Sequence, residues 1–236
     1  MSETLIKNTQ IEHLTACAEL QRLCFPNLPP EELLTEAHIV NHIRLFPEGQ
    51  FVAIDKDTGR VVGMTAGFRT HFDFAHALTH DHCYTQATGG RWFSHHNPRG
   101  HYYYGADMTV HPDFRGRGIA RAFYDARKAL CRRLNLKGQV VCGMIPGYKD
   151  YKHAMQANAY VRLVITEAVF DGTLSTQLRN DFKVRGLIAN YVQDTPTHGW
   201  AVLLEWRNPD HTENGLHLPQ PYAEFFKQQQ AIEHTL

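Results

Sequence analysis

The most constraining feature of this 236-residue chain is a glycine-rich loop between a strand pattern and a helix pattern, at residues 108–120, MTVHPDFRGRGIA. The apolar residues before Pro112 predict a strand that the proline ends, and those from Ile119 onward predict an amphipathic helix. Such a loop leaves backbone N–H groups unpaired at the positive end of a helix, where a phosphate or pyrophosphate binds. Gly116 and Gly118 carry no side chain that would block this approach.

Positive charge is concentrated around this loop. Residues 115–137 hold eight basic residues and one acid, Asp125, although the chain as a whole balances 24 Lys+Arg against 24 Asp+Glu. Arg115, Arg117 and Arg121 stand where they oppose the helix dipole, and an anionic ligand would relieve that conflict. The other interpretation is an ordinary strand-to-helix turn with surface arginines. The loop matches neither a Walker motif nor a G-x-G-x-x-G dinucleotide motif.

Composition excludes several classes of protein. A net charge of zero argues against a dedicated nucleic-acid binder, which carries a basic surplus. No run reaches the roughly 18 apolar residues of a membrane helix, and the polar start lacks a signal-peptide core. The five cysteines are odd in number and never spaced C-x-x-C, so they suggest neither a disulfide framework nor a zinc knuckle. We therefore expect a soluble, cytoplasmic protein with no membrane or nucleic-acid partner.

Hydrophobic periodicity predicts one mixed sheet with helices, of the α/β (α+β) class. Expected strands cover residues 4–7, 50–54, 61–68, 102–111, 139–144, 182–192 and 200–206. Expected helices cover residues 11–23, 30–43, 119–134 and 151–170. No domain boundary is evident before about residue 207. We expect a single domain at residues 4–206 with an insertion at about 70–100, and a polar tail at 207–236 with one short helix at 222–233.

The loop motif, RGRGIA at residues 115–120, closely resembles the acyl-CoA-binding motif R/Q-x-x-G-x-G/A of the GNAT N-acyltransferases. The order of elements is also similar. Further segments resemble a subgroup of that family found fused to nitrilase-like carbon–nitrogen hydrolase domains: residues 20–26, 46–52, 145–148, 174–184 and 203–206. One departure is Asp181, where the subgroup usually has glycine. The resemblance implies a GNAT fold, a single twisted and mostly antiparallel sheet flanked by helices.

The resemblance also implies how acetyl-CoA would bind as co-substrate. Backbone groups of strand 102–111 would bond the pantetheine arm between two splayed parallel strands, and loop N–H groups would hold the pyrophosphate. The implied cofactor-binding residues are Met108, Thr109, Val110, Arg115, Gly116, Arg117, Gly118, Ile119, Ala120 and Arg121. The family transfers acetyl directly from the CoA sulfur to an amine, so a primary amine of a small molecule or peptide is the implied acceptor.

Direct transfer needs a base to deprotonate the amine and an acid to protonate the departing thiolate. Asp107 is the first choice for the base, because strand alternation places it with Thr109 on the face opposite Met108 and Val110. An ordinary hydrogen-bonded carboxylate at the strand end is the alternative. Family members often use a tyrosine after the fifth strand as the acid, and both Tyr148 and Tyr151 lie there. Tyr148 is preferred because it belongs to the matched segment 145–148; either could instead serve packing.

The insertion is rich in histidine: eight of the sixteen histidines lie between His71 and His111. His76 and His80 are spaced for one helix face, but the set lacks the complete spacing and the supporting carboxylates of a metal site, so no metal is expected. We expect the insertion to wall the acceptor pocket, packed down by Tyr84, Trp92 and Phe93. The rival function is a catalytically silent acyl-CoA-binding module, a sensor or the partner of a hydrolase. The sequence leaves open whether the protein is a homodimer.

Overall fold

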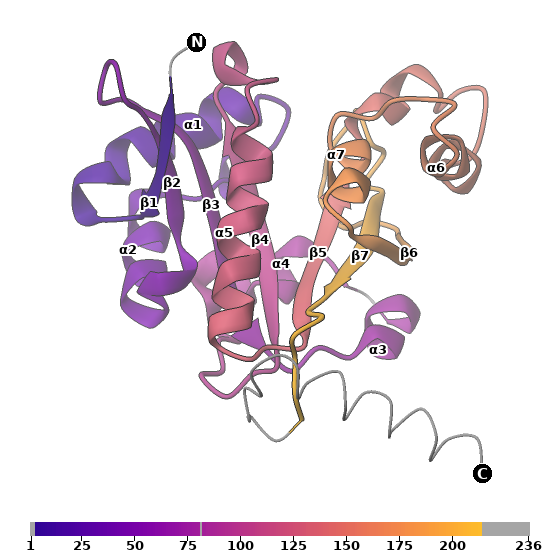
Figure 1. Cartoon of the computed structure of the whole chain (residues 1–236). Coiled ribbons are helices and arrows are strands. Elements are labelled where there is room, and N and C mark those ends of the chain that lie inside the picture. Colours follow the sequence, from indigo (N-terminus) through magenta and orange to yellow (C-terminus); the bar gives the residue numbers. More distant parts are fainter. Residues whose placement is uncertain (1–2, 81, 214–236) are drawn as a thin grey trace.

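A computed structural model of the chain describes residues 3–80 and 82–213. Its apolar runs form one seven-stranded sheet in the order β1-β2-β3-β4-β5-β7-β6 (Figure 1). Every neighbouring pair is antiparallel except β4 and β5, which are parallel. The strands are β1 (Thr4–Asn8), β2 (Phe51–Asp55), β3 (Val61–Thr70), β4 (Tyr102–Val110), β5 (Gly138–Met144), β6 (Lys183–Ile188) and β7 (Ala201–Arg207). The predicted class, a mixed and mostly antiparallel sheet flanked by helices, is confirmed.

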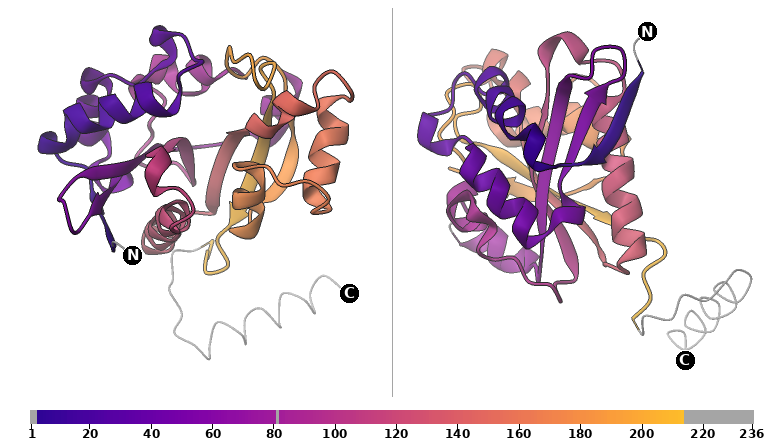
Figure 2. Two further views of the ribbon diagram at one scale, coloured as in Figure 1. Left: turned by 90° about the horizontal axis from the view of Figure 1, so that it is seen from above. Right: turned by 90° about the vertical axis from the view of Figure 1, so that its left-hand side faces the viewer.

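Helices cover both faces of this sheet (Figure 2). On one face, α5 (Ile119–Arg133), α6 (Ala157–Ile165) and α7 (Leu174–Arg179) enclose a core that includes Phe123, Tyr160 and Leu174. The other face is covered by α1 (Leu14–Cys24), α2 (Glu36–Leu45), α3 (Phe74–Thr79) and α4 (Tyr84–Ala87), around a second core. The strands β2, β3, β5 and β7 are therefore largely buried on both faces, which explains why they read as continuous apolar runs rather than alternating ones.

The two central strands separate after a short stretch of pairing. Parallel pairing of β4 with β5 runs from Tyr102↔Gly138 to Gly105↔Val141. Beyond Gly105, β4 pairs only with β3, across a register break between Ala66 and Gly67. The sheet therefore opens between β4 and β5 toward the end where α5 begins (Figure 1).

Most predicted elements are confirmed to within a few residues, including the helix after the glycine-rich loop. The helix predicted from residue 30 is wrong at its start: Pro30–Glu32 forms one 3₁₀ turn, and Leu33 is extended. Leu33 and Leu34 are both buried, and the Leu34 amide donates to the Gln21 side chain at 3.3 Å instead of continuing a helix. The helix proper begins at Glu36 after Thr35, whose hydroxyl accepts from the His38 amide.

The prediction of a helix over 151–170 is also largely wrong. Only Ala157–Ile165 is helical, because Pro146–Asp150 forms a 3₁₀ helix and turns follow it. Glu167 ends α6 with a positive φ of 59°, and the amide of Ala168 donates to the carbonyl of Leu163. Glycine is the usual signal for such an end, so the boundary is hard to see in the sequence. The short helix α7 was not predicted.

Two remaining expectations have structural outcomes. Asp181, where related sequences usually have glycine, adopts a positive φ of 65° and pairs with Lys128 at 3.1 Å. In the insertion, Tyr84 and Phe93 are buried as expected. Trp92 is 44% exposed, and its ring contacts the ring of His38. The helix predicted at 222–233 lies outside the described residues. Within them, no helix is long and apolar enough to cross a membrane.

Candidate active site

The glycine-rich loop leads into α5 with its backbone amides free. Gly116 and Gly118 have φ of +74° and +81°, a left-handed conformation that glycine adopts without strain. Gly118 is the N-cap and supplies no side-chain cap. In the described part of the chain, the amides of residues 116–121 donate no hydrogen bond, while the flanking amides of Arg115 and Ala122 bond Pro112 and Gly118. Six consecutive donors therefore remain for an anion at the positive end of α5.

The three arginines of this region are exposed and differ in their contacts. Arg115 Nε donates to the Val110 carbonyl at 3.2 Å, and Arg117 donates to the Asp113 carbonyl at 2.8 Å while covering the Phe114 ring. Arg121 makes no ion pair within the described residues. Their charges therefore reinforce an electropositive surface around the free amides.

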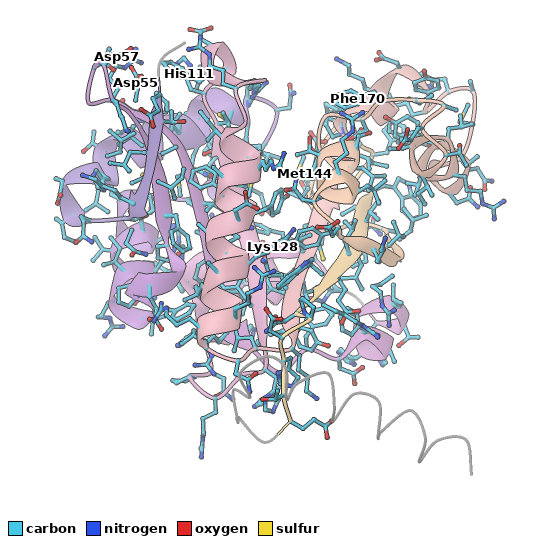
Figure 3. All side chains as sticks on the ribbon, viewed as in Figure 1. Asp55, Asp57, His111, Lys128, Met144 and Phe170 are labelled. Atoms are coloured by element: carbon cyan, nitrogen blue, oxygen red, sulfur yellow. The ribbon has the colours of Figure 1, made fainter. Side chains whose placement is uncertain are left out.

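The end of β4 offers backbone groups on its free side. The amide of His111 donates to the Val62 carbonyl of β3, so by alternation the groups of Met108 and Val110 point away from β3, toward the divergence. The Val110 carbonyl already accepts from Cys24 Sγ at 3.4 Å and from Arg115. His111, next to β4, and Met144, the last residue of β5, lie on opposite sides of this opening (Figure 3). An extended ligand could bond the remaining groups as an added strand.

Asp107 lies on β4 beside the divergence, with a partly exposed side chain. Its Oδ1 accepts from Gln21 Nε2 of α1 at 2.9 Å. Burial raises the pKa of Asp107 to about 6, although the Gln21 hydrogen bond and the Arg127 charge act to lower it. Met108 and Val110 pack instead with the core beneath α5. Asp107 is thus a carboxylate at neutral pH that takes up a proton just below it.

Two residues of this site were missed in the sequence. Gln21 also accepts from the Leu34 amide at 3.3 Å, which ties α1, the α1–α2 loop and Asp107 together. Arg127 of α5 is buried, and its Nη2 donates to the carbonyls of Ala66 and Asp107. A polar residue on an apolar helix face was a signal for Gln21. Arg127 offered none, because it belongs to a run of basic residues expected at the surface.

The two candidate acids, Tyr148 and Tyr151, both pack against the Tyr160 ring. Tyr148 is buried and its hydroxyl donates to the Met155 carbonyl at 2.9 Å. Tyr151 is partly buried, packs against the Tyr160 ring, and its hydroxyl makes no hydrogen bond within the described residues. Neither tyrosine has a hydrogen bond to Asp107 in that part of the chain. The structure therefore does not link these side chains into one preformed network.

The insertion packs against the face of the sheet that carries Asp107. Tyr84 of α4 is buried in the core beneath α1 and α2, and its pKa is raised well above the usual value, first by burial and then by the Asp107 charge. The hydroxyl of Thr85 donates to Glu32 in the α1–α2 loop. Arg91 donates at 3.5 Å to the Leu33 carbonyl of the same loop. The insertion and the α1–α2 loop thus form one wall beside Asp107.

The histidines do not converge on a metal site. His76 and His80 stack with ring centroids 4.2 Å apart, and His82 lies 3.3 Å from the Tyr104 hydroxyl. No group of three or more potential metal ligands occurs in residues 3–80 and 82–213. His82 packs among the rings of Phe72, Tyr104 and Tyr191, whereas His76 and His80 are exposed.

The arrangement can hold a diphosphate at the start of α5, bond an extended chain along β4 and present a carboxylate beside it. The sequence matches the acetyltransferase (GNAT) family over residues 14–144. It is 32% identical over 201 residues to an uncharacterized N-acetyltransferase of Bacillus subtilis (strain 168), YkwB, covering 85% of each chain. It is 34% identical over 224 residues to the probable hydrolase YhcX of the same organism, covering 94% of this chain and 41% of that one.

The chain therefore spans about two fifths of the length of YhcX. Among solved structures, the GphF GNAT-like decarboxylase in complex with isobutyryl-CoA has a TM-score of 0.71 at 19% identity, covering 86% of this chain and 98% of that chain. At this identity the likeness shows the fold. The family match covers more than half of the chain and includes the glycine-rich loop, β4 and all of β5. The chain belongs to the GNAT family of acetyltransferases.

Proposed function

We propose that this protein transfers an acetyl group from acetyl-CoA directly to a primary amine of a small molecule or peptide. One observation carries the proposal: six free amides at the start of α5 adjoin an opening between β4 and β5, and Asp107 lies at that opening. The GphF structure holds an acyl-CoA, which supports the same class of ligand here. The free cysteines of the described residues fit the reducing cytoplasm as the location.

The residues present fit acetyl-CoA as co-substrate. The amides of residues 116–121 and the charges of Arg115, Arg117 and Arg121 would hold its pyrophosphate. Free backbone groups of Met108 and Val110 would bond the pantetheine arm, with Thr109 buried on the other side of β4. The bound molecule supplies the activated acetyl group. All of these contacts are made by the backbone or by exposed cations, so the fold itself builds the site.

Asp107 would act as the general base. An alkylammonium group has a pKa near 10, so the incoming amine must lose a proton before it can attack. The Asp107 carboxyl, with a pKa of about 6, is ionised at neutral pH and can accept that proton directly or through one water. Its hydrogen bond to Gln21 leaves Oδ2 free of other partners within the described residues. The acceptor would approach beside Tyr84 and the α1–α2 loop.

A tyrosine would return a proton to the departing sulfur, and the contacts favour Tyr151 over Tyr148. The hydroxyl of Tyr148 is engaged with the Met155 carbonyl, whereas that of Tyr151 is free of such a bond in the described part of the chain. A phenol suits the task because its usual pKa near 10 keeps it protonated at neutral pH.

The second candidate function is a catalytically silent acyl-CoA-binding module. It is favoured by the engaged hydroxyl of Tyr148 and by the lack, within the described residues, of a hydrogen bond between Asp107 and either tyrosine. Such a module would bind acetyl-CoA through the same loop and show no amine-dependent release of CoA. A single measurement therefore distinguishes the two functions.

That measurement is thiol release from acetyl-CoA in the presence of a panel of primary amines, with acetylated products identified by mass spectrometry. Calorimetry with CoA is run in parallel. Amine-dependent release that Asp107→Asn reduces supports the proposed transferase. Tight CoA binding without release from any amine class supports the silent module. Absence of CoA binding would contradict both.

A further inference from the structure

Arg127 carries a positive charge into the interior without a carboxylate partner beside it. The residue is 1% exposed, and no ion pair to it occurs among the described residues. Its Nη2 donates to the carbonyls of Ala66 at 3.1 Å and Asp107 at 2.7 Å, and its guanidinium lies 5.2 Å from the centroid of the Tyr103 ring. Its Nε has no hydrogen-bond partner among residues 3–80 and 82–213. Burying a charge costs free energy of folding, so a residue of this kind is expected to have a structural or functional role.

The guanidinium sits at an irregularity of the sheet. Ala66 pairs with Asp107 and Gly67 with Gly105, so Ala106 is an extra residue on β4. A bulge of this kind interrupts the ladder and re-aims the side chains next to it. Arg127 donates to one carbonyl on each strand at this point, and the Thr65 hydroxyl also donates to the Asp107 carbonyl at 2.7 Å. The bulge is thus held by side chains where the backbone ladder fails.

Gly105, which has no side chain, leaves space for the Arg127 guanidinium. A Cβ atom on Gly105 would lie 2.5 Å from Nη1 of Arg127 and 2.9 Å from Val141. Any larger residue at this position would therefore displace either the guanidinium or the β4–β5 pairing. Gly105 is also the last β4 residue paired with β5, so the bulge, the buried charge and the divergence of the strands coincide.

Asp107 is the carboxylate on which the Arg127 charge acts. The ionisable groups that influence or face Asp107 among the described residues are Cys17 and Cys24 on α1, Tyr84 on α4 and Arg127 on α5. The pKa values of both thiols and of the phenol are raised, chiefly by burial, so these three groups are neutral at pH 7. Gln21 contributes a hydrogen bond but no charge. Arg127 is therefore the cation of this set.

We propose that Arg127 is a positioning residue for Asp107: its guanidinium holds the β4 bulge that aims the carboxyl at the opening, and its positive charge favours the carboxylate form. The role of Asp107 as base rests on the proposed function, whereas the coupling between the two residues does not. The Arg127 charge acts on the carboxyl through space, whereas its hydrogen bonds act on the β4 main chain. Variants that keep one of these properties can therefore separate the two effects.

The test is a titration of the Asp107 carboxyl by NMR in protein labelled with ¹³C at the aspartate carboxyl, with the resonance assigned by its loss in Asp107→Asn. Arg127→Lys keeps the charge, Arg127→Gln keeps donors without charge, and Arg127→Met keeps neither. Lys128→Met is the matched control, because Lys128 is the next residue of α5 and faces Asp181 and Trp206 instead. CoA binding by calorimetry reports whether the loop remains intact.

We expect the midpoint to rise by about one unit in Arg127→Gln and Arg127→Met, and to stay near wild type in Arg127→Lys and Lys128→Met. An unchanged midpoint in the Gln variant would overturn the inference. So would a Lys variant that matches the Gln variant or fails to fold, because Arg127 would then serve core structure alone. If the Arg127 variants shift the Asp107 midpoint but the protein acetylates no amine, the proposed function is contradicted and the inference stands. If the protein acetylates an amine but the variants do not shift the midpoint, the inference is contradicted and the proposed function stands.

Discussion

Gln21 holds Asp107 from a helix 86 positions earlier in the chain: its side-chain Nε2 donates to Oδ1 of the carboxyl at 2.9 Å. The Oε1 atom of the same amide accepts from Leu34, so Gln21 cannot turn without also losing that bond. The candidate base is therefore oriented by α1 on one side of the sheet, while α5 on the other side contacts its main chain. Because these contacts fix the orientation of the Asp107 carboxyl, a proton donor must approach it from one defined side.

The first prediction concerns the pH dependence of acetyl transfer. In the proposed mechanism Asp107 accepts the proton as a carboxylate, so kcat/KM should rise with pH through a midpoint of about 6 and level off above it, until the ionisation of the amine determines the rate. Asp107→Asn should remove this acidic limb and lower the rate by about 10²–10⁴-fold at pH 7. Steady-state rates from pH 5 to 9 measure both.

Gln21→Leu is the companion variant. It removes the hydrogen bond that lowers the pKa of Asp107, so the midpoint should move to higher pH while CoA affinity stays unchanged. A limb that persists in Asp107→Asn would assign the titration to another group.

The second prediction is that Asp107 costs stability. Because burial raises its pKa, the folded protein binds a proton more tightly than the unfolded chain between about pH 4 and pH 6, and stability falls as pH rises through that window. A shift of about two units corresponds to roughly 3 kcal/mol, an upper limit for a partly exposed carboxyl. Asp107→Asn should therefore be more stable than wild type at pH 8.

Urea unfolding at pH 4, 6 and 8 checks this prediction, with the difference between the two proteins growing from pH 4 to pH 6 and constant above. Asp125→Asn is the matched control, because Asp125 is exposed and has no hydrogen bond or ion pair within the described residues. Equal stability at every pH would show that the Asp107 carboxyl is well solvated.

The sequence predicts the loop well because its signals are local. Pro112, Gly116 and Gly118 determine where β4 ends and α5 begins, and no distant residue is needed to place the free amides. The alternation of Asp107 against Met108 also follows from strand geometry alone. By contrast, the bulge at Ala106 depends on pairing with β3 and leaves no mark in the sequence.

The parts that were missed depend on tertiary contacts. Arg127 is a basic residue in a helix with exposed arginines on either side, and only the fold shows that it is buried beneath the sheet. The helix α7 begins at Leu174 because the Asp171 side chain accepts its first amides, and α6 ends at a left-handed glutamate. The end of α6 lacks the usual glycine, and at the start of α7 the residue that accepts the amides lies two positions before the N-cap Thr173, whose own side chain makes no cap bond.

A third prediction concerns Asp171, which is fully buried and accepts four hydrogen bonds. Its Oδ1 accepts from the amides of Thr173 and Leu174, and its Oδ2 accepts from the Gly147 amide and the Tyr160 hydroxyl. Asp171→Ala should lower the free energy of unfolding by about 3 kcal/mol or more, since buried donors lose their partner. Chemical denaturation measures the loss.

Because Gly147 precedes Tyr148, this variant should also loosen the segment that carries both candidate acids. Asp125→Ala, at an exposed position on α5, should change the free energy of unfolding by less than about 0.5 kcal/mol. A similarly small loss in Asp171→Ala would mean that water replaces all four contacts.

The fourth prediction separates the two tyrosines. Tyr151→Phe should lower kcat by about 10²–10⁴-fold with little change in CoA affinity or thermal stability, because its hydroxyl serves no hydrogen bond within the described residues. Tyr148→Phe should instead lower stability by about 1 kcal/mol, since the Met155 carbonyl loses its donor, with a smaller effect on kcat. The reverse pattern would assign the acid to Tyr148, and full activity in both would leave proximity as the source of catalysis.

The fifth prediction tests the loop. Gly118→Asp should abolish CoA binding, because a carboxylate would stand beside the amides that we propose to hold the pyrophosphate, and the loss of two or three charge-assisted contacts weakens affinity by orders of magnitude. The positive φ of +81° adds backbone strain to any substitution, so strain and charge must be separated. Gly118→Asn carries the same strain without the charge and should retain part of the affinity.

The matched control is Gly59→Asp, in the β2–β3 connection at φ +70° with open space around it. This variant should cost similar stability and leave CoA binding intact. Calorimetric titration with CoA ranks the three variants, and normal binding by Gly118→Asp would show that the pyrophosphate lies elsewhere.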